Sequence, residues 1–130
     1  MTVVLAHSPA PSAHAAFASA LEQARMSGTD LVLLNVSSND ALADPKHASD
    51  DVLAGYLAEG EQAGVATRIE RVVASDAAEA VLETARRLDA RLVVVGVRHR
   101  SSVGKLLMGS TAQRILLAAE CDVLAVKVKR

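Results

Sequence analysis

The sequence has few of the residue types on which several binding chemistries depend. Apart from histidine, its 130 residues include only two aromatic side chains, Phe17 and Tyr56, with one cysteine and no tryptophan. Two rings are too few for a flavin sandwich or for a surface on which single-stranded nucleic acid stacks. The lone Cys121 excludes an intrachain disulfide framework and suits a reducing compartment. We therefore expect a cytoplasmic protein.

The sequence also has no large excess of one charge sign and no long apolar run. Lys and Arg number 14 against 15 Asp and Glu, so the chain has no cationic excess for a nucleic acid. No apolar run approaches the roughly 20 residues of a membrane span, and the first residues lack the basic start of a signal peptide. Hydrophobic residues make up 51% of the chain, enough for the core of one domain covering residues 1–130.

What the sequence does contain is a regular alternation of two patterns. Short apolar, β-branched runs predict strands at Thr2–Ala6, Asp30–Val36, Val65–Ala74, Arg91–Gly96 and Val123–Val128. Stretches with apolar residues at steps of three and four predict helices between them. We expect the first helix to stop at Gly28, the second to end near Gly64, the third to start at Asp76 with Glu79, and the last to open at Gly109.

This alternation predicts an α/β fold, a doubly wound five-stranded parallel sheet of order 3-2-1-4-5 with helices on both faces. The third strand alternates polar and apolar residues, which suggests an edge position. Ligands in such sheets bind beyond the carboxyl ends of the strands, where the strand order reverses. The segments Ala6–Pro11 and Gly96–Thr111 are expected there, and Ser37–Asp50 is expected to be a loop.

Several ligand motifs of such folds are missing from these segments. The first strand ends in Ala6-His7-Ser8 rather than in the acidic residues of a phospho-acceptor receiver, and no glycine follows it. The absence of glycine also excludes the G-x-G-x-x-G loop of a dinucleotide site. Gly104-Lys105 is followed by Leu106, so it does not form a P-loop.

The segment after the fourth strand carries phosphate-binding chemistry instead. Gly109, Ser110 and Thr111 open a helix whose first backbone N–H groups favour an anion. Basic or protonatable side chains precede that helix at Arg98, His99, Arg100 and Lys105. No nucleophile–base pair or acidic metal cluster accompanies them, so we predict binding without catalytic or metal-binding residues. The alternative is that Ser110 merely caps the helix.

These residues resemble a family pattern. Gly96, His99 and Gly109-Ser110 stand at the positions of the G-x2-G-x9-G-[S/T] motif of nucleotide-binding universal stress proteins. Cys121–Val126 is similar to the closing CPVLVV strand of that family, and Lys105–Ser110 is also typical of it. The resemblance implies a stress-response protein that binds an adenine nucleotide, ATP, and forms a homodimer; it implies no enzyme beyond slow ATP hydrolysis.

The resemblance also implies a role for individual residues. Adenine would lie against the backbone of Val36. Ribose would lie near Leu5, Ala6 and His7. The phosphates would run along Gly96, Arg98 and His99 towards Gly109, Ser110 and Thr111.

Two positions depart from the family pattern. His99 replaces the second glycine of the motif, and His7 replaces the Asp that ends the first strand in nucleotide-binding members. The second change removes an oxygen ligand for Mg²⁺. The alternative function is thus a nucleotide-free interaction module with the same fold, its crevice narrowed by His7 and His99. Two histidines without a third ligand make a poor zinc site, and a pH-sensing pair has equally little support.

Two further alternatives concern catalysis and assembly. An adenine-nucleotide hydrolase of related fold would need an S-G-G-x-D-S type of loop after the first strand, which this chain lacks. Family members resembling this chain dimerise by antiparallel pairing of the last strand, here Val123–Val128, whose alternation suggests one wetter face. The opposing interpretation is an edge protected by Lys127, Lys129 and Arg130.

Overall fold

A computed structural model describes residues 2–8, 12–38, 49–97 and 109–127. Its strands are β1 (Thr2–His7), β2 (Asp30–Ser37), β3 (Thr67–Val73), β4 (Ala90–Val97) and β5 (Asp122–Lys127). Its helices are α1 (Ala13–Ser27), α2 (Asp50–Gln62), α3 (Ala77–Arg87) and α4 (Ser110–Ala118). The strands form one sheet of order β3-β2-β1-β4-β5 in which every neighbouring pair is parallel. The predicted fold class, strand order and edge position of the third strand are confirmed.

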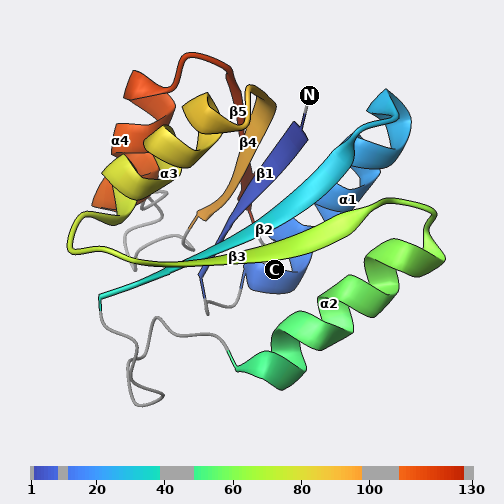
Figure 1. The fold of residues 1–130 in the computed structure, drawn as a ribbon. Helices are drawn as coiled ribbons and strands as arrows, with labels where there is room; N and C mark the ends of the chain where they lie inside the picture. The colour runs from blue at the N-terminus through green and yellow to red at the C-terminus, as the bar shows by residue number, and fades with distance from the viewer. Residues whose placement is uncertain (1, 9–11, 39–48, 98–108, 128–130) are drawn as a thin grey trace.

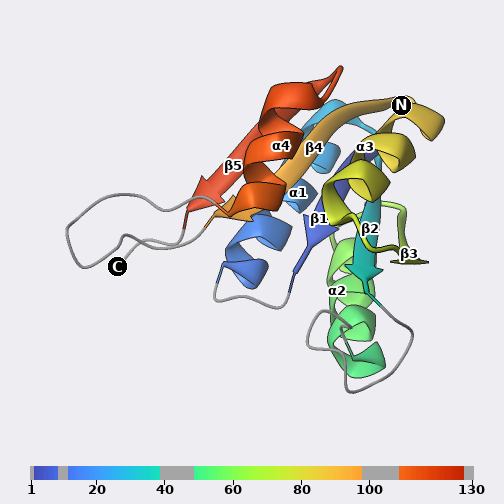
Figure 2. The same ribbon diagram turned by 90° about the vertical axis from the view of Figure 1, so that its left-hand side faces the viewer.

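Helices cover both faces of the sheet, as the sequence predicts. Figures 1 and 2 show α1 and α2 on one face and α3 and α4 on the other. Side chains of one strand point alternately to the two faces, so Leu5 packs in the core under α1 while Val4 packs in the core under α3 and α4. The central strands β1, β2 and β4 are buried on both faces, which explains their almost continuous apolar sequence.

Two helix boundaries follow the expected local chemistry. Gly28 ends α1 in the left-handed conformation, with a φ of 67°, where a glycine has no steric penalty. At the start of α3 the Asp76 carboxylate accepts a hydrogen bond of 3.1 Å from the backbone N–H of Glu79. Both predicted boundaries are confirmed.

Two boundaries on either side of α2 differ from the expectation. β3 begins at Thr67 rather than Val65, because the Val65 N–H still donates to the Gly60 carbonyl in the turn that ends α2. Asp50, assigned to a loop, is the first residue of α2, which Ser49 caps by accepting from the Val52 N–H at 3.2 Å. Residues 39–48 of the expected loop lie outside the described residues.

The wetter face expected for the last strand is wrong over its described part. Ala125 packs against the core under α3 and α4, whereas Leu124 and Val126 pack against the core under α1. Both faces of β5 are therefore half-buried, and only its end residues Asp122 and Lys127 are exposed. Within the described parts of the chain, no helix is long and apolar enough to cross a membrane.

Candidate functional site

A cavity of about 570 Å³ opens beyond the carboxyl ends of β1 and β4, at the point where the strand order reverses. Its described lining residues are Ala6, His7, Ser8, Ser12, Leu34, Val36, Ala77, Val81, Val95, Gly96, Val97, Gly109, Ser110, Thr111, Ala112 and Ile115. Figure 2 shows α4 starting at the end of the sheet where β4 finishes. The structure thus brings the ends of three strands, the start of α4 and one side of α3 to a single hollow.

Seven of the ten predicted site residues line this cavity. They are Ala6, His7, Val36, Gly96, Gly109, Ser110 and Thr111. Leu5 does not, because the alternation along β1 directs its side chain into the core under α1, where it is 1% exposed. Arg98 and His99 lie outside the described residues. The expectation that His99 narrows the crevice therefore stays a prediction.

The start of α4 supplies hydrogen-bond donors to the cavity. Gly109 is the residue preceding the helix, and its carbonyl accepts the first intrahelical bond, 3.0 Å from the Gln113 N–H. Gly109, the N-cap residue, has no side chain with which to cap this end, and Ser110 is already inside the helix, so N-capping does not explain the Ser110 hydroxyl. The first N–H groups of the helix have no partner within it, and the helix dipole adds positive potential at the same place. This end of the cavity suits an anion.

The opposite wall is apolar. Leu34 and Val36 of β2, Val81 of α3 and Ile115 of α4 all line it. Aliphatic walls beside a backbone strand end can hold the faces of a flat heterocycle without any aromatic side chain. The cavity therefore combines an apolar part with an anion-binding part.

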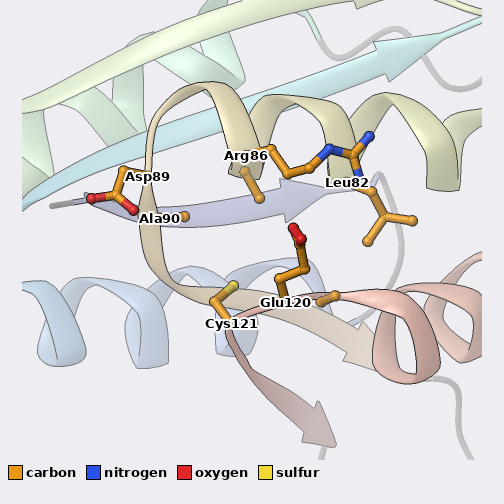
Figure 3. Close-up of a pocket in the computed structure, with 8 residues that line it drawn as sticks. Leu82, Arg86, Asp89, Ala90, Glu120 and Cys121 are labelled. Atoms are coloured by element: carbon orange, nitrogen blue, oxygen red, sulfur yellow. The ribbon is translucent and has the colours of Figure 1, made fainter.

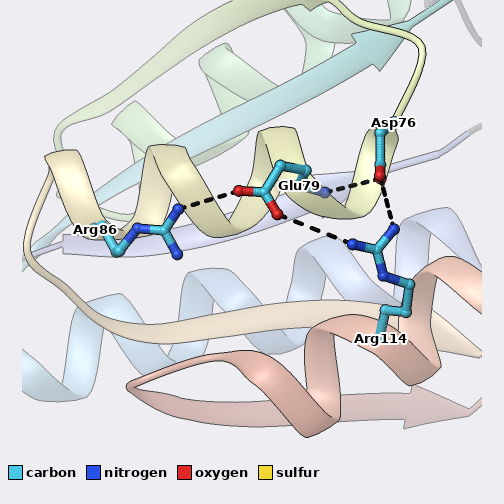
Figure 4. Close-up of polar contacts among 4 residues, drawn as sticks. All are labelled: Asp76, Glu79, Arg86 and Arg114. Atoms are coloured by element: carbon cyan, nitrogen blue, oxygen red, sulfur yellow. Dashed lines mark hydrogen bonds and ion pairs between the residues drawn. The ribbon is translucent and has the colours of Figure 1, made fainter.

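Ion pairs connect the start of α3 to α4, as Figure 4 shows. The guanidinium of Arg114 donates to both carboxylate oxygens of Asp76, at 2.9 and 2.8 Å, and lies 3.9 Å from a carboxylate oxygen of Glu79. Glu79 also accepts from Arg86 at 3.2 Å. The hydrogen bonds from Arg114 hold the pKa of Asp76 below its ordinary value, so the pair stays charged at neutral pH.

His7 borders the cavity, but its ring packs on the other side of β1. The imidazole meets the Tyr56 ring edge-on at 5.8 Å between centroids, and both ring nitrogens are buried without a hydrogen-bond partner among the described residues. Burial, with a smaller contribution from the charge of Arg71, lowers the pKa of His7, so the ring is neutral at neutral pH. A neutral ring turned towards Tyr56 does not narrow the cavity.

Gly96 has a packing reason that the motif alone does not suggest. A Cβ atom at this position would lie 2.5 Å from the hydroxyl oxygen of Ser12 and 3.1 Å from its Cβ. Gly96 therefore lets the start of α1 approach β4 at the rim of the cavity. Sequence reasoning missed Ser12, although its place immediately before a predicted helix, opposite the strand carrying Gly96, was a usable signal.

A second, smaller cavity of about 280 Å³ lies at the other end of the sheet (Figure 3). It is bordered by the last residues of α3 and α4, with Arg86, Asp89, Glu120 and Cys121 among its lining. Burial raises the pKa of the Cys121 thiol, which keeps it protonated and unreactive, as a small apolar residue would be. No three potential metal ligands come together among the described residues.

Comparison with known proteins identifies the family. The profile of the universal stress protein family matches residues 1–127. A "Universal stress protein" from Mycolicibacterium smegmatis is 38% identical over 125 residues, covering 96% of each chain. The chain belongs to the universal stress protein family. The resemblance noted in its motifs is confirmed over nearly the whole length.

Solved structures of universal stress proteins share the fold. One, determined in complex with cAMP, is 25% identical, with a TM-score of 0.75 over 97% of this chain and 96% of that one. Another, from Archaeoglobus fulgidus in complex with dAMP, is 18% identical, with a TM-score of 0.71 over 97% and 96% of the two chains. Both structures have the same overall fold as this universal stress protein domain.

Proposed function

We propose that this universal stress protein binds an adenine nucleotide in the cavity at the carboxyl end of the sheet. The observation that carries the proposal is the union of an apolar wall at Val36 with the uncapped start of α4 at Gly109 in one hollow. The first suits a purine and the second suits a phosphate. The complexes of two similar universal stress proteins, with cAMP and dAMP, support this ligand class.

The phosphate chain is the less determined part of the ligand. ATP is the nucleotide that the sequence motif implies, and its triphosphate is normally accompanied by Mg²⁺. The described lining of the cavity contains no Asp or Glu, and His7 stands where a carboxylate would serve the metal. None of the described lining residues supplies a carboxylate ligand for Mg²⁺. The proposal assigns the phosphate to Gly109, Ser110 and Thr111, with Gly96, Arg98 and His99 as the further residues that the sequence motif implies. It includes no catalytic step.

Thermal shift measured with ATP, AMP and cAMP, each with and without Mg²⁺, tests the proposal. A ligand present at one hundred times its dissociation constant stabilises the folded state by roughly 2.7 kcal/mol, which is easily detected. We expect stabilisation that Mg²⁺ does not increase. Absence of any shift at millimolar nucleotide would favour the nucleotide-free interaction module instead.

Variants locate the site. Gly109→Val places two methyl groups beside the first N–H groups of α4, while valine tolerates the extended backbone of that residue, φ −64° and ψ 155°. We expect loss of nucleotide binding with the fold retained. Gly55→Ala in α2, where an added Cβ meets nothing within 4 Å, is the matched control and should bind as the unaltered protein does. Full affinity in Gly109→Val would move the phosphate elsewhere.

The proposal includes a homodimer formed through the last strand, Val123–Val128, of which residues 123–127 are described. β5 lies at the edge of the sheet, its side chains are only half-buried, and the adjacent helix α4 exposes Leu117 by 80%. Pairing of β5 with a second copy would satisfy its free backbone groups and cover apolar area.

Size-exclusion chromatography with light scattering, over a range of concentrations and with or without nucleotide, measures this assembly. Leu117→Glu should weaken the dimer, whereas Met26→Glu, at another apolar position of α1 that is 67% exposed, should not. A monomer at every concentration contradicts the dimer without affecting the nucleotide proposal. Nucleotide-dependent dimerisation would connect ligand binding to a stress signal.

A further inference from the structure

His7 is the last of three polar side chains that form a row across β3, β2 and β1, on the face covered by α1 and α2. In the parallel register His7 pairs with Asn35, and Asn35 pairs with Arg71, so the three side chains share one face at the carboxyl end of the sheet. Arg71 donates to the Asn35 side-chain oxygen at 3.0 Å and to Asp50 at the start of α2 at 2.9 Å. The row thus leads from β1 to α2.

Aromatic contacts join the same elements. The Tyr56 ring of α2 stacks on Phe17 of α1, with centroids 4.3 Å apart and planes at 26°. The His7 ring touches the same tyrosine edge-on. On the outer side of Tyr56, His14 of α1 lies 4.0 Å from the carboxylate of Glu59. Tyr56 is therefore the point at which α2 attaches to β1 and α1.

A proton on His7 has no acceptable place in this arrangement. An imidazolium has two N–H donors, and both nitrogens of His7 are buried with no acceptor for them in the part of the chain that the structure describes. The charged group lying nearest along the row, Arg71, carries the same sign, and the compensating carboxylate of Asp50 is already paired with it. Protonation therefore requires that water reach the ring.

Of the two helices joined at Tyr56, α2 is the less firmly packed on the sheet. α1 is held by four buried side chains, Ala16, Phe17, Ala20 and Ala24. In α2 only Leu53 and Gly60 are buried, and Val52 of its first turn is 47% exposed. Of the two helices that enclose His7, α2 has much less apolar contact to lose when it separates from the sheet.

We propose that His7 is an acid-sensitive latch for α2: when its imidazole takes up a proton, α2 separates from β1 and α1 at the Tyr56 contact. The latch is closed at neutral pH, and its opening becomes progressively more favourable as the pH falls below about 6.5, the ordinary pKa of an exposed histidine. The other ionisable groups facing it already have partners of opposite charge or polarity. His14 lies 4.0 Å from a carboxylate oxygen of Glu59, and Arg71 lies 2.9 Å from a carboxylate oxygen of Asp50.

Amide hydrogen exchange, corrected for the intrinsic pH dependence of exchange, tests the latch at pH values from 8 to 5. In the unaltered protein, we expect the opening constant of α2 (Asp50–Gln62) to rise by up to about tenfold per pH unit below 6.5, while that of α3 (Ala77–Arg87) stays constant. His7→Phe keeps an apolar ring against Tyr56 and cannot take up a proton, so its α2 opening should not depend on pH in this way.

Further variants separate the effect of His7 from that of its neighbours. His14→Gln removes the exposed histidine beside the same tyrosine and should leave the acid response of α2 in place. Should His7→Phe not fold, His7→Gln supplies a neutral polar substitute with the same expectation. A pH-independent α2 in the unaltered protein, an equal response in the His7 variants, or loss of protection in α2 and α3 together would each overturn the latch. The measurement needs no ligand and is independent of nucleotide binding.

Discussion

Ser12 occupies the space that a side chain at Gly96 would need. The Ser12 hydroxyl oxygen lies 2.5 Å from the position of an added Cβ, and Ser12 itself is buried at 5% exposure. The start of α1 and the end of β4 are thus in close contact beside the cavity at the carboxyl end of the sheet. A glycine that the family motif assigns to the ligand also has a role in the packing of the protein.

This contact predicts a cost for Gly96→Ala. Overpacking of a buried contact lowers the free energy of unfolding by about 1–3 kcal/mol. Ser12→Ala removes the oxygen, which makes no capping hydrogen bond in the folded protein, so alone it should cost little. The double variant should recover part of the loss, because only the 3.1 Å contact to the Cβ remains. Strictly additive effects in urea unfolding would contradict the contact.

Two glycines of α2 predict opposite responses to the same substitution. At Gly60, buried against β3, an added Cβ would overlap the side chain of Thr67. Gly60→Ala should therefore destabilise the protein by about 1–3 kcal/mol. At Gly55 nothing lies within 4 Å, so Gly55→Ala should stabilise it by about 0.5–1 kcal/mol through helix propensity. Thermal unfolding measures both, and shifts of the same sign would show that α2 lies differently.

The buried His7 predicts a pH dependence of global stability. Because its pKa is lowered in the folded state, the unfolded chain binds the proton more readily, and stability is complete above about pH 6.5 and decreases below it. The slope for one proton is at most about 1.4 kcal/mol per pH unit. His7→Phe should flatten the profile between pH 7 and 5.5 in chemical denaturation. Unaltered curvature in that variant would assign the effect to other groups.

The pairing of Asp76 with Arg114 predicts that substituting Asp76 lowers the melting temperature more than substituting Arg114. Asp76→Ala removes both the cap of α3 and the ion pair, and should lower the melting temperature measurably. Asp76→Asn keeps an acceptor for the Glu79 N–H, and Arg114→Gln removes only an exposed pair, so both should remain near the unaltered value. A melting temperature lowered equally by Arg114→Gln and Asp76→Ala would show that the ion pair dominates.

The fold was predictable because local signals agree with one another. Apolar runs in β1, β2 and β4 and the stops at Gly28 and Asp76 together leave one topology for a chain with strictly alternating elements. The start of β3 was missed because Val65 has the composition of a strand, while its N–H completes the turn after α2. Composition cannot show which partner a backbone group selects.

The site was predictable where it depends on backbone position. The places of Ala6 and Gly109 follow from the rule that ligands lie beyond the strand ends, whereas that of Val36 came from the resemblance to universal stress proteins. The direction of the His7 ring did not follow from the motif, because the motif records residue types and not the face of the strand on which each side chain lies. Counting alternate residues from Val3 and Leu5, which belong to the core under α1, would have found it.

The two edge strands of the sheet, β3 and β5, differ in the charges that an approaching strand would meet. On β3, Glu70 pairs with Arg87 at 2.6 Å and Arg68 with Asp30 at 2.9 Å, so a strand approaching that edge meets fixed charges. Val123–Val126 of β5 carries none. In the proposed homodimer, an edge at β5 that can pair and an edge at β3 that carries charges would allow one copy to join another but would not allow a chain of copies to grow. Such an arrangement would limit the assembly to two copies and would oppose fibre formation.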